Sequence, residues 1–305
     1  MSMKKNWALL VAAVIFISGI IVGSFYDQEI SKALFVDREP FCIAITALWL
    51  IPAYGFVSFI GGILFRHAFQ FNYPKWMKAI LIVLAFVGLG SGVYFSSNEF
   101  FSINGFNKPG IGFTFLSLGI SLIIHSGISV FGYFAGKGIK NKNAWIAILI
   151  LAAAFIISTV PCVQSLKSIM HRPRYRTVQL GIEGLTYHQW WEPFTNYKEF
   201  VSSGVLKEEF KSYPSGHAAV SAASGFFLYL LSYCYPKLKK HRNLLFLIGT
   251  LYCFLVCFAR MRVGAHFMSD VSFGALLTIV LMGVAFVVTE KLKLFEEPNV
   301  EEITK

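Results

Sequence analysis

Charged residues are scarce in this sequence: Lys, Arg, Asp and Glu make up only 14% of its 305 residues. Since about a quarter of the residues of a typical soluble domain are charged, this composition excludes a soluble globular protein. Hydrophobic residues make up 56% of the chain and fall in long runs. We therefore expect an all-α integral membrane protein, a polytopic bundle of transmembrane helices.

The sequence also lacks the ligand patterns of a metal site. Its five cysteines include no C-x-x-C pair and lie within or at the ends of apolar runs, where we expect small core residues. No acidic cluster suited to magnesium and no Cys/His set suited to zinc accompanies the polar motifs. We therefore expect no metal and no other cofactor.

The net charge of +11 does not indicate binding to nucleic acid. No basic helix with interleaved aromatic residues stands apart from the apolar runs. The basic residues instead gather in alternate loops, as in a membrane protein with cytoplasmic positive charge. With Lys4 and Lys5 inside the cell, this pattern predicts a multi-pass protein of the cell membrane with both termini in the cytoplasm.

About eight apolar runs approach the length of a helix that crosses a bilayer. They are Trp7–Phe25, Phe41–Phe65, Ala79–Phe95, Ile111–Ala135, Ala144–Val163, Tyr213–Tyr235, Leu244–Ala259 and Phe267–Val288. The first run is an alternative candidate for a cleavable signal peptide, but it is long for one and no A-x-A site follows it.

The predicted organisation follows the position of the polar motifs. Residues 1–143 hold four spans, residues 144–290 hold four spans and all the expected chemistry, and residues 291–305 form a cytoplasmic tail. With eight spans, every polar motif faces the extracytoplasmic side.

The most specific motif is Pro214-Ser215-Gly216-His217, where a polar loop meets an apolar run. It is expected to form the first turn of a helix, because proline loses no helical hydrogen bond there. The free N–H groups of that turn and the Ser215 hydroxyl suit an anion, and Gly216 lets the anion approach the backbone. Alone, the tetrapeptide also fits an ordinary helix start.

A second motif joins Arg260, His266 and Asp270 before the last run. The spacing of four predicts that His266 and Asp270 share one helix face. Asp270 would then accept a hydrogen bond from one ring nitrogen and leave a lone pair on the other for attack on phosphorus. An ionisable cluster at the membrane boundary is costly, which favours a functional role.

A third motif is a basic segment that follows the fifth run. Lys167 and Arg174 suit a phosphate held by cations, since guanidinium forks grip two oxygens at once. The segment alone also fits a juxtamembrane basic patch, and Arg172, Arg176 and Arg262 are possible contacts to a lipid headgroup.

In their order along the chain, these motifs resemble the signature of the type 2 phosphatidic acid phosphatase and vanadium haloperoxidase superfamily, K-x6-R-P, P-S-G-H and S-R-x5-H-x3-D. The resemblance covers about Ala144–Val288, roughly half of the chain. Ala259 stands in place of the serine of S-R-x5-H-x3-D, and Tyr175 in place of the proline of K-x6-R-P. A shorter register of the K-x6-R-P motif, with Arg172 as the phosphate ligand, therefore stays open.

The resemblance implies a role for each matching residue. His266 is similar to the nucleophile that accepts the phosphoryl group, Asp270 to its orienting partner, and His217 to the general acid. The residues that would hold the non-bridging oxygens are Lys167, Arg174, Ser215, Gly216 and Arg260. This set implies a metal-independent hydrolase with a phosphohistidine intermediate.

A site at the outer ends of membrane helices predicts a lipid phosphate as the substrate. Candidates are phosphatidate, phosphatidylglycerol phosphate, a lipid A phosphate and undecaprenyl diphosphate. A lipid phosphotransferase would use the same residues and stays an alternative. So does an inactive transporter or scaffold with this fold. The sequence does not indicate an oligomeric state.

Two further patterns concern the fold. His125 in the fourth run is expected to hydrogen-bond a neighbouring helix, and Gly88, Gly90 and Gly92 to allow close packing of helices. The aromatic residues of the loop 177–211, among them Trp190 and Phe194, are expected to cover the site as a lid or to lie in the membrane interface.

Overall fold

The computed structural model describes residues 6–37, 39–48, 50–99 and 111–296. This part of the chain contains helices and no strand, which confirms the all-α class. The helices are α1 (Trp7–Leu34), α2 (Pro40–Leu48), α3 (Leu50–Gln70), α4 (Lys75–Glu99), α5 (Ile111–Gly136), α6 (Ala144–Thr159), α7 (Pro161–Met170), α8 (Tyr175–Val178), α9 (Tyr197–Ser202), α10 (Gly216–Cys234), α11 (Arg242–Arg262) and α12 (Met268–Lys291). Most of the predicted tail, residues 297–305, lies outside the described residues.

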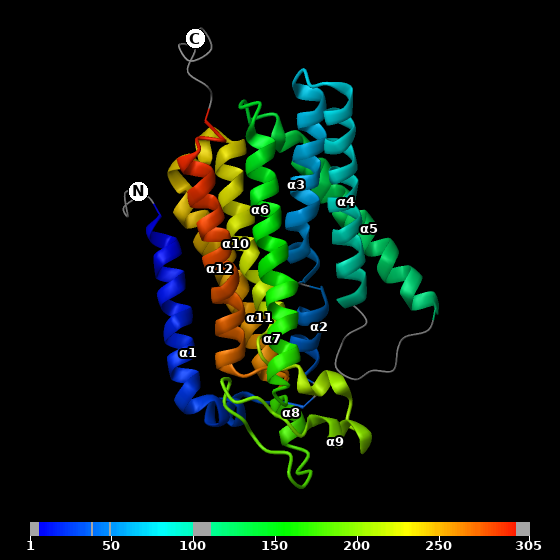
Figure 1. Ribbon diagram of the computed structural model, residues 1–305, viewed down its shortest axis with the longest axis vertical. Helices are drawn as coiled ribbons and strands as arrows, with labels where there is room; N and C mark the ends of the chain where they lie inside the picture. Colours follow the sequence, from blue (N-terminus) through cyan, green and yellow to red (C-terminus); the bar gives the residue numbers. More distant parts are fainter. Residues whose placement is uncertain (1–5, 38, 49, 100–110, 297–305) are drawn as a thin grey trace.

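Seven segments of the described chain are long and apolar enough to cross a membrane. They contain α1, α4, α5, α6 with α7 and α8, α10, α11 and α12, and they make the protein a multi-pass membrane protein. The remaining predicted run, Phe41–Phe65, corresponds to α2 and α3. Helix α3 packs against α4 and α5 inside the bundle (Figure 1).

Helix α1 extends beyond its predicted end at Phe25 as far as Leu34. The polar residues that suggested an end include Asp27 and Ser31, which are buried on one stripe of the helix together with Gly23. Residues spaced by four lie on the same helix face. The stripe therefore stays in contact with neighbouring helices where the sequence becomes polar.

The predicted span Ala144–Val163 is two helices. Helix α6 ends at Thr159 and α7 begins at Pro161. Proline lacks a backbone N–H and tolerates only the first turn of a helix, so it ends α6 and starts α7.

The helices pack in two groups of consecutive helices, and α1 joins the second group. Helices α3, α4 and α5 pack against one another, and α10, α11 and α12 pack against one another. Helix α1 lies along α12 and α11 (Figure 1) rather than beside α3, the next long helix in the chain. The first helix is therefore part of the packing around the motif-bearing helices.

Both described chain ends lie at one end of the bundle. The Tyr229 hydroxyl is 2.9 Å from Oδ1 of Asn6 and 3.1 Å from Oε1 of Glu290, which places the start of α1 beside the end of α12. Helices α7, α8 and α9 lie at the opposite end (Figure 1).

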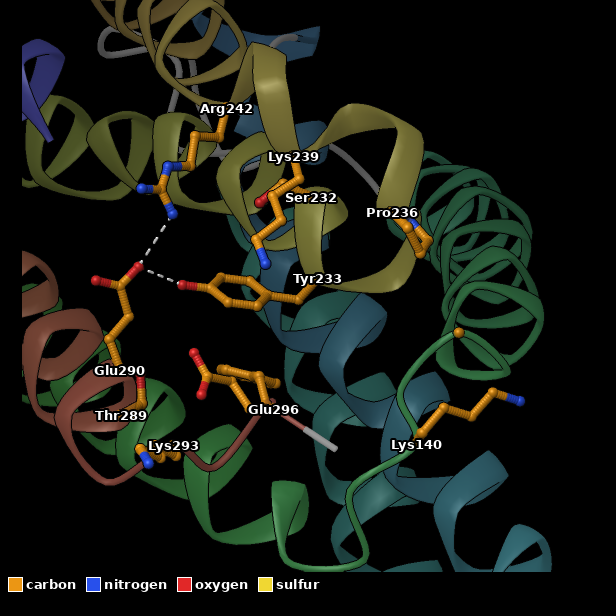
Figure 2. Close-up of a pocket in the computed structure, with 12 residues that line it drawn as sticks. Lys140, Ser232, Tyr233, Pro236, Lys239, Arg242, Thr289, Glu290, Lys293 and Glu296 are labelled. Atoms are coloured by element: carbon orange, nitrogen blue, oxygen red, sulfur yellow. Dashed lines mark hydrogen bonds and ion pairs between the residues drawn. The ribbon is translucent and has the colours of Figure 1, made fainter. Parts of the chain in front are cut away.

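A cavity of about 330 Å³ lies at the end that holds the chain termini (Figure 2). The carboxylate of Glu290, which lines this cavity, already has protein partners. It accepts a 2.6 Å hydrogen bond from the Tyr233 hydroxyl and lies 3.4 Å from Nη1 of Arg242. The residues described as lining it include none of the predicted catalytic residues. The cavity is therefore separate from the predicted site.

His125 on α5 hydrogen-bonds two neighbouring helices, which confirms the prediction of a bond to a neighbouring helix. Its Nδ1 lies 2.8 Å from Oγ of Ser58 on α3, and its Nε2 lies 2.7 Å from Oγ of Ser96 on α4. A Cβ at Gly92 would lie 2.7 Å from Nδ1 of His125, so this glycine permits the close packing. At Gly90 a Cβ would have no neighbour within 4 Å, so the packing role predicted for Gly90 is wrong.

Candidate active site

The three motifs meet at the end of the bundle opposite the described chain ends. Each motif residue lies at or near a helix terminus, where backbone N–H or C=O groups lack partners within the helix. Lys167 lies in the last turn of α7, and Arg174 immediately precedes α8. Ser215, Gly216 and His217 lie at the start of α10. Arg260 lies in the last turn of α11, His266 just before α12 and Asp270 in the first turn of α12.

His266 is the most informative residue of the group. Its side chain is only 1% exposed. Burial lowers the pKa of His266 well below its ordinary value, and the nearby charges of Arg260, Arg174, Lys167 and His217 lower it further. The neutral imidazole is therefore favoured. These four neighbours come from all three motifs, so His266 lies where the motifs converge.

The hydrogen bond of His266 fixes its tautomer. Its Nδ1 lies 2.6 Å from the backbone carbonyl oxygen of Ser212. Because a carbonyl oxygen can only accept, Nδ1 carries the proton and Nε2 keeps the lone pair. This is the state that a nucleophilic histidine needs.

The predicted direct hydrogen bond between His266 and Asp270 is absent from the described geometry. Nδ1 of His266 lies 4.0 Å from Oδ2 of Asp270, beyond hydrogen-bond distance. The prediction assumed one helix face, but His266 precedes α12 and only Asp270 lies on it. Asp270 instead accepts hydrogen bonds from Oγ of Ser212 at 2.5 Å and from the N–H of Phe267 at 2.9 Å.

The start of α10 brings His217 close to His266. The two ring centroids are 6.3 Å apart, close enough for both rings to contact one phosphate group. A Cβ at Gly216 would lie 3.7 Å from Nζ of Lys167. The Lys167 ammonium and the first turn of α10 therefore face the same space, as a site for an anion requires.

Ser215 is the N-terminal cap of α10. Its Oγ accepts from the N–H of Ala218 at 3.4 Å, and its own N–H donates to the carbonyl of Asp270 at 3.0 Å. A Cβ at Gly274 would overlap the Ser215 carbonyl, so this glycine permits close contact between α12 and the start of α10. The two helices that carry His217 and Asp270 are thereby held in register.

Arg174 faces the space around the two histidines. Its Nε is buried and has no hydrogen-bond partner among the described residues. Its backbone N–H donates to the carbonyl of Glu209 at 2.9 Å, which fixes the segment before α8. A buried guanidinium nitrogen without a partner is costly and suits a bound anion.

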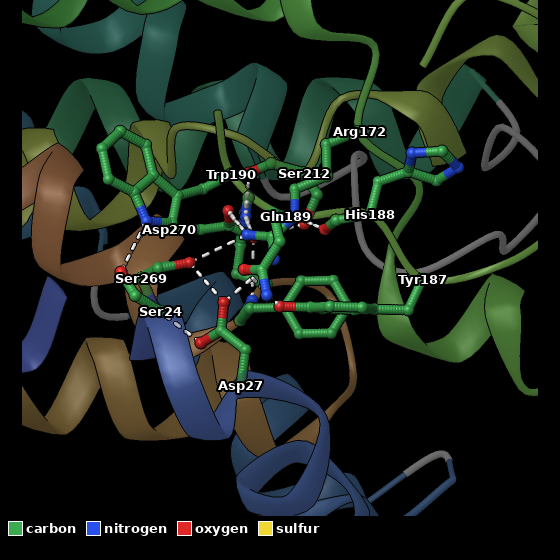
Figure 3. A network of polar contacts seen from close by, with 12 residues as sticks. Ser24, Asp27, Arg172, Tyr187, His188, Gln189, Trp190, Ser212, Ser269 and Asp270 are labelled. Carbon is green, nitrogen blue, oxygen red and sulfur yellow. Dashed lines mark hydrogen bonds and ion pairs between the residues drawn. The ribbon is translucent and has the colours of Figure 1, made fainter. Parts of the chain in front are cut away.

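Arg172 has a different environment and is fully buried (Figure 3). Its Nη1 lies 2.5 Å from Oδ1 of Asp270, its Nη2 lies 2.9 Å from Oδ2 of Asp27, and its Nε donates to the carbonyl of His188 at 2.8 Å. The guanidinium also lies 4.2 Å from the ring centroid of Phe267. A headgroup contact for Arg172 is therefore ruled out in this structure, because two carboxylates and a carbonyl occupy its three nitrogens.

Arg176 and Arg262 also have protein partners. Arg176 forms a bidentate pair with Glu209, with distances of 2.9 Å from Nε to Oε2 and 2.5 Å from Nη2 to Oε1. Arg262 donates from Nη1 to the carbonyl of Leu34 at 3.0 Å. A headgroup contact by Arg176 or Arg262 stays a prediction.

Glu209 lies in the short 3-10 helix Lys207–Phe210 between α9 and α10. Burial raises the pKa of its carboxyl, but the hydrogen bond from Arg176, the charges of Arg174 and Arg176 and the hydrogen bond from Thr177 outweigh it and lower the pKa to about 2. The carboxylate is therefore charged at neutral pH and links Arg176 to the segment before α10.

Residues 143–294 match the family model of the PAP2 superfamily. The chain belongs to the PAP2 superfamily. The match contains all three motifs and helices α6 to α12, and PAP2 proteins generally hydrolyse phosphate esters. No curated protein and no solved structure matches the chain.

Three buried polar residues beside the PAP2 motifs were not predicted. They are Asp27, Ser212 and Ser269, and with Arg172 and Asp270 they form a network that we call the Arg172 cluster (Figure 3). Asp27 follows the predicted end of the first run, and its burial depends on how α1 packs against α12. The two serines carry no signal in the sequence either, because serine is common in loops and helix starts.

The loop 177–211 of the PAP2 segment folds over the Arg172 cluster. The Trp190 indole donates to Oγ of Ser24 at 2.9 Å and its ring stacks on Tyr213 with centroids 5.7 Å apart. Phe194 stacks on Phe210 inside a small core of the loop itself. Trp190 therefore packs between α1 and Tyr213, and Phe194 is buried in the core of the loop; a lid over the site stays a prediction.

The described part of the PAP2 site is rich in cations rather than in metal ligands. In the residues that the structure describes, no group of three or more His, Cys, Asp or Glu side chains is placed to hold a metal ion. Lys167, Arg174 and Arg260 supply positive charge, which suits the oxygens of a phosphate.

Proposed function

We propose that this PAP2 protein is a membrane phosphatase that hydrolyses a lipid phosphate or prenyl diphosphate through a phosphohistidine at His266. The observation that supports this most is the state of His266. The ring is buried and neutral, its Nδ1 donates to the Ser212 carbonyl, and Lys167, Arg174, Arg260 and the His217 ring lie near it.

In the first step, Nε2 of His266 attacks phosphorus and forms an N–P bond while the bond from phosphorus to the lipid oxygen breaks. His217, whose protonated form is favoured by the negative charge of the bound phosphate, gives a proton to the departing oxygen. The 6.3 Å between the two ring centroids supports this pairing of nucleophile and acid.

In the second step, water attacks the phosphorus and the N–P bond breaks. His217, now neutral, accepts a proton from that water, and inorganic phosphate leaves. The two steps together add one water across the original P–O bond and return both histidines to their starting states.

The charge that develops on the phosphoryl oxygens meets fixed donors. We assign these contacts to Lys167, Arg174 and Arg260, with the Ser215 hydroxyl and the Gly216 N–H at the start of α10. Because cations can neutralise this charge, the reaction requires no metal ion. Asp270 acts on His266 through Ser212 rather than directly.

The position of the site supports a lipid substrate. It lies at the ends of membrane helices, where a phosphate headgroup can enter while the tail stays in the bilayer. The opposite end carries Lys137, Lys140, Lys239 and Lys240, which supports a cytoplasmic position for that end and an extracytoplasmic site in the cell membrane. Phosphatidate, phosphatidylglycerol phosphate, a lipid A phosphate and undecaprenyl diphosphate are the substrates to test.

The decisive experiment is phosphate release from these lipids by the purified protein in detergent. His266→Ala should abolish release, and His241→Ala, an exposed histidine near the other end of the bundle, should retain it. Radiolabelled substrate should leave an acid-labile, alkali-stable label on the wild type, as expected for an N–P bond. More than a few per cent of activity in His266→Ala would remove His266 from the nucleophile role.

Metal independence has its own test. Activity should survive excess chelator and should be blocked by vanadate, which mimics the five-coordinate phosphorus of the transition state. Loss of activity in chelator with recovery on adding magnesium would contradict this part of the proposal. Addition of an acceptor lipid to the same assay detects the phosphotransferase alternative as a labelled lipid product.

A further inference from the structure

We infer that Asp27, on α1 and outside the segment that matches the PAP2 superfamily, is a positioning residue for phosphoryl transfer at His266. The inference rests on the proposed function, because it concerns the same site. It makes the first helix of the chain a part of the catalytic unit, although no PAP2 motif lies on that helix.

Asp27 is buried and its carboxylate is fully used. Oδ2 accepts from Nη2 of Arg172 at 2.9 Å and from the hydroxyl of Ser269, and Oδ1 accepts from the backbone N–H of Ser269 at 2.9 Å. Ser269 is in the first turn of α12, one residue before Asp270. Asp27 therefore caps α12 from a neighbouring helix and fixes the start of the helix that carries Asp270.

Asp27 also sets the charge balance of the Arg172 cluster. Arg172 lies between Asp27 and Asp270, with a nitrogen toward each carboxylate at 2.9 Å and 2.5 Å. Hydrogen bonds to ionised groups are strong in such buried surroundings. Without the charge of Asp27, Asp270 would be the one carboxylate that holds Arg172 in this cluster. The Arg172 guanidinium and the Asp270 carboxylate would then lose their fixed geometry.

The cluster reaches His266 through Ser212. The Ser212 hydroxyl donates to Asp270 at 2.5 Å, and its backbone N–H donates to the carbonyl of Arg172 at 3.1 Å. The carbonyl of the same residue accepts the Nδ1 proton of His266 at 2.6 Å. The orientation of the His266 ring thus depends on a peptide that both Asp270 and Arg172 hold in place.

A glycine in α1 permits the close approach of this helix to α12. A Cβ at Gly23 would lie 2.7 Å from the backbone nitrogen of Ser269. Only glycine permits this distance without a shift of one helix. The Trp190 indole donates a hydrogen bond to Ser24, one residue after Gly23, so the loop 177–211 holds the same part of α1.

The test compares Asp27→Asn with Glu29→Gln in the full-length protein. Both variants remove one carboxylate from α1, but Glu29 is exposed and lies outside the cluster. Rapid mixing with a radiolabelled lipid phosphate gives two quantities for each variant, the burst amplitude and the rate constant of phosphoenzyme formation. The amplitude counts competent sites, and the rate constant measures how well each site is positioned.

For Asp27→Asn we expect the rate constant to fall at least tenfold while the burst amplitude and the affinity for vanadate stay within about twofold of wild type. Glu29→Gln should match wild type in all three. If Asp27→Asn fails to fold, Ser269→Ala replaces it, since this variant removes one donor to Asp27 and keeps the backbone donor. A fall of about threefold or more in its rate constant is then expected.

A lower amplitude with an unchanged rate constant would mean that Asp27 only supports folding, and would overturn the inference. So would wild-type rate constants in both Asp27→Asn and Ser269→Ala. Failure of the wild type to form a phosphoenzyme or to release phosphate would instead overturn the proposed function itself.

Discussion

Nδ1 of His266 donates to the backbone carbonyl of Ser212 at 2.6 Å. The orienting group of the proposed nucleophile is therefore a peptide oxygen rather than a carboxylate. A peptide oxygen cannot be removed by substitution of a side chain, but its position can be changed through the groups that hold it. The Ser212 hydroxyl, which donates to Asp270 at 2.5 Å, is the nearest of these.

Replacement of Ser212 by Ala should lower kcat about tenfold and leave KM nearly unchanged. The substitution removes one buried hydrogen bond to a carboxylate, worth about 1.5 kcal/mol or more, but keeps the carbonyl that binds His266. Ser203→Ala is the matched control, because its hydroxyl makes an exposed 2.9 Å bond to the Phe200 carbonyl. Equal kcat values for the two variants would show that the Ser212 hydroxyl does not position His266.

Arg172 and Arg174 should respond differently to replacement by Ala. Arg174→Ala should lower kcat by about a hundredfold or more with little change in melting temperature, because the proposed role of Arg174 is in the transition state. Arg172→Ala should lower the melting temperature strongly, since it leaves Asp27 and Asp270 buried together without a cation, and such losses cost about 3–5 kcal/mol.

Steady-state kinetics and thermal unfolding in detergent measure both effects. A collapse of kcat in Arg172→Ala at wild-type melting temperature, with Arg174→Ala near wild type, would favour the shorter register of the K-x6-R-P motif.

Gly216→Ala should fold normally and bind phosphate poorly. The added Cβ would lie 3.6 Å from Cγ1 of Val163 and 3.7 Å from Nζ of Lys167, which are ordinary contact distances. It would also occupy the space between the Lys167 ammonium and the first turn of α10. We expect an unchanged melting temperature and at least tenfold weaker inhibition by vanadate. Gly181→Ala is not a suitable control, because Gly181 has a φ of 66° and alanine would be strained there. Gly119→Ala, with no neighbour within 4 Å of the added Cβ, is the suitable control.

Glu209 should stabilise the protein only above acidic pH. Its pKa is about 2 in the folded protein against an ordinary value of 4.5. A carboxyl whose pKa is lowered by folding stabilises the fold fully above its unfolded pKa, and this contribution disappears as the pH falls toward the folded pKa. The melting temperature of wild type should therefore exceed that of Glu209→Gln at pH 7, and the difference should shrink between about pH 4.5 and pH 2. A difference that does not change over this range would contradict the assignment.

The motif residues could be placed from the sequence because each stands at a boundary between a polar loop and an apolar run. Such boundaries become helix ends, and the ends of α7, α10, α11 and α12 meet in the structure. The contact between His266 and Asp270 could not be predicted, because it depends on where α12 begins. The helix starts after His266, so the spacing of four does not place both residues on one face.

The role of α1 was also beyond the sequence. Asp27 and Arg172 are far apart in the chain, and their contact depends on how α1 packs against α12. Hydropathy identifies a span but carries no information about its neighbours. The polar residues after Phe25 therefore predicted a loop, whereas burial against α12 makes them part of the helix.

The two described ends of the chain lie beside each other, at the far end of the bundle from His266. Under the proposed function, this arrangement makes the protein a sided catalyst in closed vesicles. Molecules inserted with the chain ends outward would act only on lipid phosphate of the luminal leaflet, and molecules inserted the other way only on that of the outer leaflet. A tag at either terminus would therefore report, by its accessibility to a protease, which leaflet each reconstituted molecule can serve.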